Sequence, residues 1–169
     1  MLKKILFFFF AASVIWASSP TVIEAPELLS YAQNHLPHEG TLRLTEDGFL
    51  YVALTKKYIL ELSPLLGKEK QVVCPPPYFA KGKVGAHITV AMPNEMKAWK
   101  KEVPFIGKKV SFSILRLEKV DLQNSILQAK TVYMLSIESP QIAEIRKKLG
   151  LPLKVQGYDF HITIAVDCP

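Results

Sequence analysis

The sequence predicts one α+β domain made of two related halves that meet at a shared central groove. Its length of 169 residues suits a single domain. A motif, His-Ile-Thr followed by a β-branched residue and Ala, occurs at 87–91 and returns at 161–165. Each copy closes a stretch that contains strands and a helix. The chain therefore has the pattern of an internal duplication, with its two motifs placed by a pseudo-twofold arrangement.

Both motif copies are expected to be short buried strands, because they are rich in β-branched residues. Side chains two residues apart in a strand point to the same face, so His87 shares a face with Thr89, and His161 shares one with Thr163. The apolar residues of each motif then pack on the opposite face: Ile88, Val90, Ile162 and Ile164. One such pair is explained by a half-buried histidine bonded to a threonine, whereas two matching copies indicate a function.

The first 19 residues have the pattern of a secretory signal peptide. They contain two lysines, then an apolar run at 5–17 that includes four consecutive phenylalanines, and they end in small residues. Cleavage after Ala17 or Ser19 is expected, which leaves 20–169 as the single domain. An uncleaved anchor is the alternative, but the apolar run is short for a membrane span. We therefore expect an exported protein with no stable membrane span, in the periplasm or the medium.

Charge and cysteine usage narrow the class of protein further. The full chain has a net charge of +6, and loss of the two leader lysines leaves 19 basic and 15 acidic residues, a net +4. Such a mildly basic chain slightly favours an anionic ligand but does not coat nucleic acid. Cys74 precedes the first motif and Cys168 follows the second. Export and an even count favour a disulfide, and two buried free thiols are the alternative.

The first half begins with a helix and a hairpin. Apolar residues at helical spacing predict a helix over 25–36. Alternating patterns predict strands over 41–45 and 49–54, joined by the turn signal at 46–48. A second helix is expected from Thr55.

The end of that second helix leads to the first motif. Its apolar stripe should be bent or ended by Pro64, and 67–70 should be a solvated loop. Three prolines make 74–79 extended. The segment beyond is either an ordinary rim loop or a ligand mouth, with rings that stack on a base and amines that hold phosphate: Tyr78, Phe79, Lys81 and Lys83.

The second half repeats this plan. Asn94 is expected to cap a short helix through Glu102, with Trp99 as its packing anchor. A strand over 108–121 should shift register around Leu115.

The closing elements lead to the second motif. After a polar connection at 123–128, a strand is expected over 131–138. Ser139 should cap a last helix, which Gly150 ends.

Two His-x-Thr strands in one groove suit chemistry at phosphorus. Imidazole titrates near neutral pH, so one of His87 and His161 can act as base while the other acts as acid. Each role typically contributes about 10²–10⁴-fold to a rate. The hydroxyls of Thr89 and Thr163 can hold non-bridging phosphate oxygens as charge develops. In-line displacement by this set needs no metal or cofactor.

Other chemistries fit less well. No Gly-x-Ser-x-Gly motif supplies a nucleophile for a triad, and neither a phosphate-binding P-loop nor a dinucleotide fingerprint is present. Cysteine catalysis is disfavoured by export. A metal held by the two motif histidines would need further ligands, and only Asp159 is near in sequence.

The segments His87-Ile88-Thr89-Val90 and His161-Ile162-Thr163-Ile164 resemble the paired motifs of the 2H phosphoesterase superfamily, over about 41–166. The first motif is similar to that of its Swiss Army knife branch of RNA-repair-like proteins. The resemblance implies a bilobal fold and action on 2',3'-cyclic phosphates of nucleotides or RNA ends. It also implies that His87 and His161 are acid and base, and that Thr89 and Thr163 bind phosphate.

Alternatives to this interpretation remain open. A non-catalytic module of the same fold could bind a phosphate ligand or RNA, and an envelope protein could use its histidines structurally. Many relatives act inside cells, whereas this chain has an export signal. That difference favours nucleotide scavenging or an environmental or host substrate. We expect a monomer.

Overall fold

The computed structural model describes residues 19–69, 73–97, 99, 103, 105–122 and 129–168. Residues 1–18 of the predicted leader at 1–19 and the connection at 123–128 lie outside these residues, so the signal-peptide prediction stays a prediction. Among the described helices, none combines the length and hydropathy that a membrane crossing requires.

Within the described residues, nine strands form one antiparallel sheet of order β1-β7-β8-β9-β5-β3-β2-β6, with β4 paired to β9 off this path. Their bounds are β1 (Thr21–Val22), β2 (Glu39–Leu44), β3 (Leu50–Ala53), β4 (Val73–Cys74), β5 (His87–Ala91), β6 (Lys109–Ser111), β7 (Ser113–Asp121), β8 (Thr131–Glu138) and β9 (His161–Asp167). The hairpin of β2 and β3 is as predicted.

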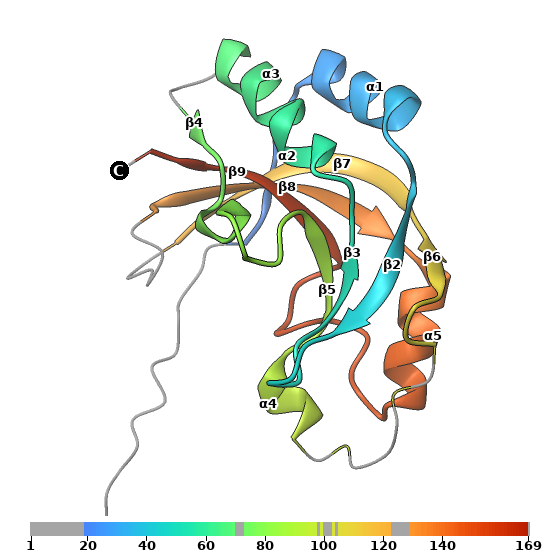
Figure 1. The fold of residues 1–169 in the computed structure, drawn as a ribbon. Coiled ribbons are helices and arrows are strands. Elements are labelled where there is room, and N and C mark those ends of the chain that lie inside the picture. Colours follow the sequence, from blue (N-terminus) through green and yellow to red (C-terminus); the bar gives the residue numbers. More distant parts are fainter. Residues whose placement is uncertain are drawn as a thin grey trace, which may run out of the picture.

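The helices are α1 (Pro26–His35), α2 (Lys57–Leu60), α3 (Leu62–Glu69), α4 (Pro93–Met96) and α5 (Pro140–Lys148), with a 3-10 turn η1 at Pro77–Phe79. Figure 1 shows α1, α2 and α3 together above the sheet, with α5 on the other side of the molecule. α2 and α3 contact β9, whereas α5 contacts β5 and β6. The predicted α+β class is confirmed.

The motif strands β5 and β9 are neighbours in the middle of the sheet. On one side of this pair lie β3 and β2, and on the other lie β8 and β7. In the chain, each half includes a pair of neighbouring strands, β2–β3 or β7–β8, which is followed by helix and later by the motif strand. The strands of the two halves run in different directions (Figure 1), so the sheet turns where β5 meets β9.

The core lies where the helices pack on the sheet. The motif residues predicted to face inward, Ile88, Val90, Ile162 and Ile164, are completely buried. They join one cluster with apolar residues of α1, α3 and α5. Burial of these side chains anchors both motif strands and leaves their opposite face for polar side chains.

The helix predicted from Thr55 is two helices, because the chain breaks at Glu61 between α2 and α3. Pro64 lies in the first turn of α3, three residues after this break, where its missing N–H is tolerated, so the predicted interruption of the helix near Pro64 is confirmed. The loop predicted to begin at Gly67 is wrong, since α3 continues through Glu69 and buries Leu66.

The helix predicted to start at Asn94 begins at Pro93 and ends at Met96. Its N-terminal side-chain contact comes from Glu95, whose carboxylate accepts a hydrogen bond from Met92 N at 2.8 Å, so the Asn94 cap is wrong. Much of the predicted stretch through Glu102 lies outside the described residues. Trp99 packs against the core, as expected.

The strand predicted over 108–121 is divided into β6 and β7 at Phe112, whose N–H bonds His38 O at 3.0 Å. The predicted register shift is confirmed, since the pairing of β7 with β8 slips between Ile114 and Arg116. Ser139 Oγ accepts from Ile142 N at 3.3 Å, which confirms the cap of α5.

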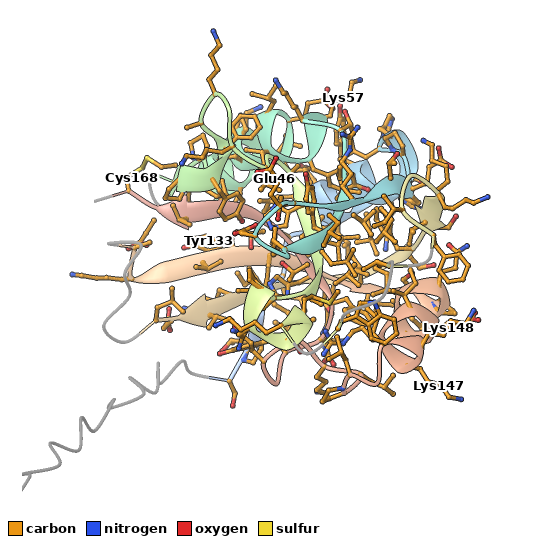
Figure 2. The ribbon with its side chains drawn as sticks, turned by 60° about the horizontal axis from the view of Figure 1, so that its bottom comes forward. Glu46, Lys57, Tyr133, Lys147, Lys148 and Cys168 are labelled. Carbon is orange, nitrogen blue, oxygen red and sulfur yellow. A yellow bond between two sulfur atoms is a disulfide. The ribbon has the colours of Figure 1, made fainter. Side chains whose placement is uncertain are left out.

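Cys74 and Cys168 form a disulfide with a Cα–Cα distance of 5.1 Å. The pairing of β4 with β9 brings the two residues together. Figure 2 shows Cys168 at the edge of the molecule away from Lys147 and Lys148 of α5. Of the two alternatives left by the sequence, the disulfide is therefore the one observed.

Candidate active site

The two motifs meet because β5 and β9 pair antiparallel through Ile88 and Ile162. On the opposite face, an antiparallel register then sets His87 on the side of Thr163, and Thr89 on the side of His161. All four polar side chains are partly buried. The structure thus brings together the four residues that the sequence singled out.

Each histidine ring is held in the same way. Nδ1 of His87 lies 2.7 Å from the carbonyl oxygen of Gly85, and Nδ1 of His161 lies 2.9 Å from that of Asp159. A carbonyl can only accept, so Nδ1 carries the proton in both rings. Nε2 of each neutral ring is then left as an acceptor. Gly85 has φ +76°, a left-handed conformation that favours glycine at this turn.

The two imidazoles differ in their charged surroundings. Burial lowers the pKa of His87 below its usual 6.5; the Gly85 carbonyl raises the pKa in part and the charge of His161 lowers it. Burial also lowers the pKa of His161, but the Asp159 carbonyl and the carboxylates of Glu118 and Asp159 raise it. Acidic neighbours therefore act on His161 and favour its protonated form.

Aromatic rings cover the first histidine. The centroids of Tyr78, Phe49 and Tyr51 lie 4.9, 5.6 and 6.0 Å from that of His87, each edge-to-face. These rings exclude water from one side of His87, which explains its desolvation.

Tyr78 contacts both motifs. Its ring packs on His87, and the side chain of Thr163 partly lowers the pKa of its hydroxyl. Burial raises the pKa of Tyr78 to about 12, so it stays neutral. Tyr78 packs against His87 and Phe79 against the core, and the ligand mouth stays a prediction. Lys81 and Lys83 are exposed.

The neighbouring strands extend the site across the sheet. Tyr51 pairs with Thr89, and Ser136 pairs with both His161 and Arg116. Such cross-strand partners share a face, so these side chains lie in one row with the motif residues.

An ion pair lies at the far end of the site on β7. Arg116 Nε is 2.6 Å from Glu118 Oε1, and Glu118 is buried. Glu118 also pairs with Met134, which pairs with Thr163. The sequence pattern did not identify Glu118, because its approach to His161 depends on the register of strands far apart in the chain.

The cysteines and the possible metal ligands bear on two other mechanisms, cysteine catalysis and metal-ion catalysis. Both cysteines are in the disulfide, so neither is a free nucleophile. Within the described residues, no cluster of three or more His, Cys, Asp or Glu side chains is placed to hold a metal ion.

Comparison with known proteins identifies the class. The family model for the Swiss Army Knife 2H phosphoesterase domain matches residues 50–168. The chain therefore belongs to this family of 2H phosphoesterases, whose members typically hydrolyse phosphodiester bonds. Comparisons with curated proteins and with solved structures found no match.

Proposed function

We propose that this protein is an exported, metal-independent phosphodiesterase that hydrolyses the 2',3'-cyclic phosphate of a nucleotide or an RNA end. The observation that carries the proposal is that the two histidine rings are held by the same kind of backbone contact. Each ring bonds through Nδ1 to the carbonyl two residues before it, which leaves both Nε2 atoms for proton transfer. Two such groups supply the base and the acid that the reaction needs.

In this proposal the two halves of the sheet are lobes related by a pseudo-twofold axis, and the motifs line the groove between them. The matching strand order on either side of β5 and β9 supports this arrangement. The helices support it as well, since α2 and α3 of the first half contact β9, and α5 of the second half contacts β5.

The charges around the rings assign their roles. His87 is the general base, because burial among three aromatic rings keeps it neutral. His161 is the general acid, because Glu118 and Asp159 stabilise its protonated form. Thr89 and Thr163 hold the non-bridging phosphate oxygens, and Tyr78 fixes the orientation of Thr163.

The reaction then proceeds by in-line attack. Nε2 of His87 takes a proton from water while the water oxygen bonds to phosphorus. The bond from phosphorus to one ribose oxygen breaks, and Nε2–H of His161 donates its proton to that oxygen. The product is a nucleoside or RNA phosphomonoester. Proton exchange with solvent returns both rings to their starting states.

Two features support export. The leader has the pattern of a secretory signal, and a disulfide such as Cys74–Cys168 persists mainly in oxidising compartments. We propose that the substrate is met outside the cytoplasm, in the periplasm or the medium.

Single substitutions test the catalytic roles. His87→Asn and His161→Asn should each lower kcat by at least about 10²-fold, while the affinity for a nucleoside 3'-phosphate stays within a few-fold. His35→Asn, an exposed histidine on α1, is the matched control and should retain full activity. If the motif variants keep wild-type kcat, the histidines are not the acid and base. If no variant or wild type turns over but all bind the phosphate, the protein is a binding module.

A further inference from the structure

A cavity of about 580 Å³ lies beside the second motif. Its walls come from the start of β7, the end of β8, the start of α5, the turn after α5 and the residues before β9. Asp159 and Phe160, which immediately precede His161, form part of its wall, as does Ser136, which pairs with His161. The cavity therefore opens next to the ring to which we assign the role of acid. Its volume is typical of small-molecule sites.

Ser136 has a hydroxyl without a partner in this wall. The residue is 1% exposed, and its Oγ makes no hydrogen bond. A buried hydroxyl that is unbonded costs free energy, and such groups in native proteins call for an explanation. A ligand group in the cavity would satisfy Ser136 Oγ.

The charges around the cavity decide what kind of group it takes. Arg116 is paired with Glu118 at 2.6 Å, and Lys154 is paired with Asp159 at 3.1 Å. The exposed carboxylate of Glu138 also lies in the wall. The cations are thus compensated, which disfavours a second phosphate.

Apolar side chains make up much of the remaining wall, including Ile137, Leu153 and Phe160. A cavity of this composition suits a neutral, partly apolar group with a hydrogen-bonding edge.

We propose that this cavity binds the nucleoside portion of the substrate, an uncharged heterocyclic base with its sugar, and that Ser136 Oγ hydrogen-bonds that group. The inference rests on the proposed phosphodiesterase function and assigns its specificity subsite. A phosphate held at the motifs lies beside His161, and the same two residues that precede His161 lead from the ring to the cavity. The substituent on the phosphate therefore enters the cavity directly.

Two substrates and three variants test this assignment. The substrates are a nucleoside 2',3'-cyclic phosphate and the 2',3'-cyclic phosphate of 1-O-methylribose, which lacks the base. Ser136→Ala removes the hydroxyl, Ala143→Leu fills the cavity from α5, and Ser113→Ala is the matched control at an exposed serine of β7.

We expect Ser136→Ala to reduce the preference for the nucleotide, as the ratio of the two kcat/KM values, by about three- to tenfold, and Ala143→Leu to reduce it further. Ser113→Ala should leave the ratio unchanged. The Tm of unliganded Ser136→Ala should not fall, because an unbonded buried hydroxyl is removed. A reduction of both kcat/KM values by the same factor would show that Ser136 positions His161 and would overturn the inference.

The wild-type protein separates this inference from the proposed function. Equal turnover of both substrates would overturn the cavity assignment and leave the phosphodiesterase intact. Turnover of neither would overturn the proposed function. Titration with uncharged nucleosides would then decide on the cavity: binding that Ser136→Ala weakens supports it, and absence of binding contradicts it.

Discussion

His87 and His161 share one backbone contact and differ in their electrostatic surroundings. The pKa of each is lowered by burial, and only His161 has carboxylates that raise its pKa. In the proposed roles, His87 must be neutral as the base and His161 protonated as the acid, so activity needs a pH above the pKa of His87 and below that of His161. Because both values lie below 6.5, we expect kcat/KM to be maximal on the acid side of pH 6.5.

Glu118→Gln tests the assignment of the acid. Loss of this carboxylate removes an effect that raises the pKa of His161, so the alkaline limb of the kcat/KM profile should move to lower pH. The measurement is the pH dependence of kcat/KM, with the exposed Glu27→Gln as control. If the acid limb moves instead, His161 is the base.

Tyr78→Phe tests the contact between the two motifs. The substitution removes the hydroxyl that interacts with Thr163 and keeps the ring on His87. One hydrogen bond contributes about 0.5–1.5 kcal/mol, so kcat/KM should fall about three- to tenfold. Tyr78→Ala should also rehydrate His87, raise its pKa and move the acid limb to higher pH. Tyr31→Phe on α1 is the control; an unchanged kcat/KM for Tyr78→Phe would exclude the proposed role.

At the scale of elements, β4 and the disulfide hold the start of the segment that carries Tyr78. Cys74 pairs β4 to β9 and is bonded to Cys168, 94 residues away in the chain. A native disulfide in a small domain typically contributes about 2–5 kcal/mol.

Replacement of both cysteines by alanine should therefore lower the free energy of unfolding by about 2–5 kcal/mol, as measured by urea denaturation. Because β4 leads to Tyr78, the acid limb of the pH profile of kcat/KM should move to higher pH, as in Tyr78→Ala. Dithiothreitol should destabilise the wild type and leave the Cys74→Ala/Cys168→Ala variant unaffected. Equal stability of both proteins would contradict a stabilising disulfide.

α5 is joined to the first half through one buried arginine. Arg146 is fully buried and bonds the carbonyl of Val90 at 2.5 Å, that of Lys154 at 2.9 Å and the Glu95 carboxylate at 2.8 Å. It thus connects α5, β5, α4 and the turn that lines the cavity.

Arg146→Met should cost about 3–5 kcal/mol of stability, because Glu95 loses its buried partner and the carbonyls lose their donor. Adding Glu95→Gln should recover part of that loss, since the unpaired charge is removed. Urea denaturation of the single and double variants measures this coupling. A loss below about 1 kcal/mol for Arg146→Met would show that the network contributes little.

Local patterns predicted most elements but not their contacts. The period-two alternation over 131–138 matches β8, and the Ser139 cap starts α5. The prediction of an Asn94 cap was wrong, because Pro93 and Glu95 form a stronger helix start one residue earlier.

The candidate site could also be predicted only in part, because local patterns do not show contacts between distant strands. The repeated motif identified His87 and His161 with their threonines. Glu118 and Ser136 reach the site only through the pairing of β7, β8 and β9. That pairing depends on tertiary packing, which local sequence does not reveal.

At the scale of the whole molecule, the fold places two copies of one motif on adjacent central strands. β5 and β9 lie next to each other although their motifs are far apart in the chain. Helices of each half contact the motif strand of the other half. The two histidines that we propose as base and acid are thus brought from separate halves onto one face, as the proposed in-line displacement at phosphorus requires.

The most direct test of metal-free catalysis by the two histidines is hydrolysis of the nucleoside 2',3'-cyclic monophosphates in the presence of EDTA. Mature wild-type protein is compared with the His87→Ala/His161→Ala variant. We expect turnover by the wild type alone, with the product isomer identifying the bond that breaks. Turnover that EDTA abolishes, or equal turnover by both proteins, would contradict the central claim.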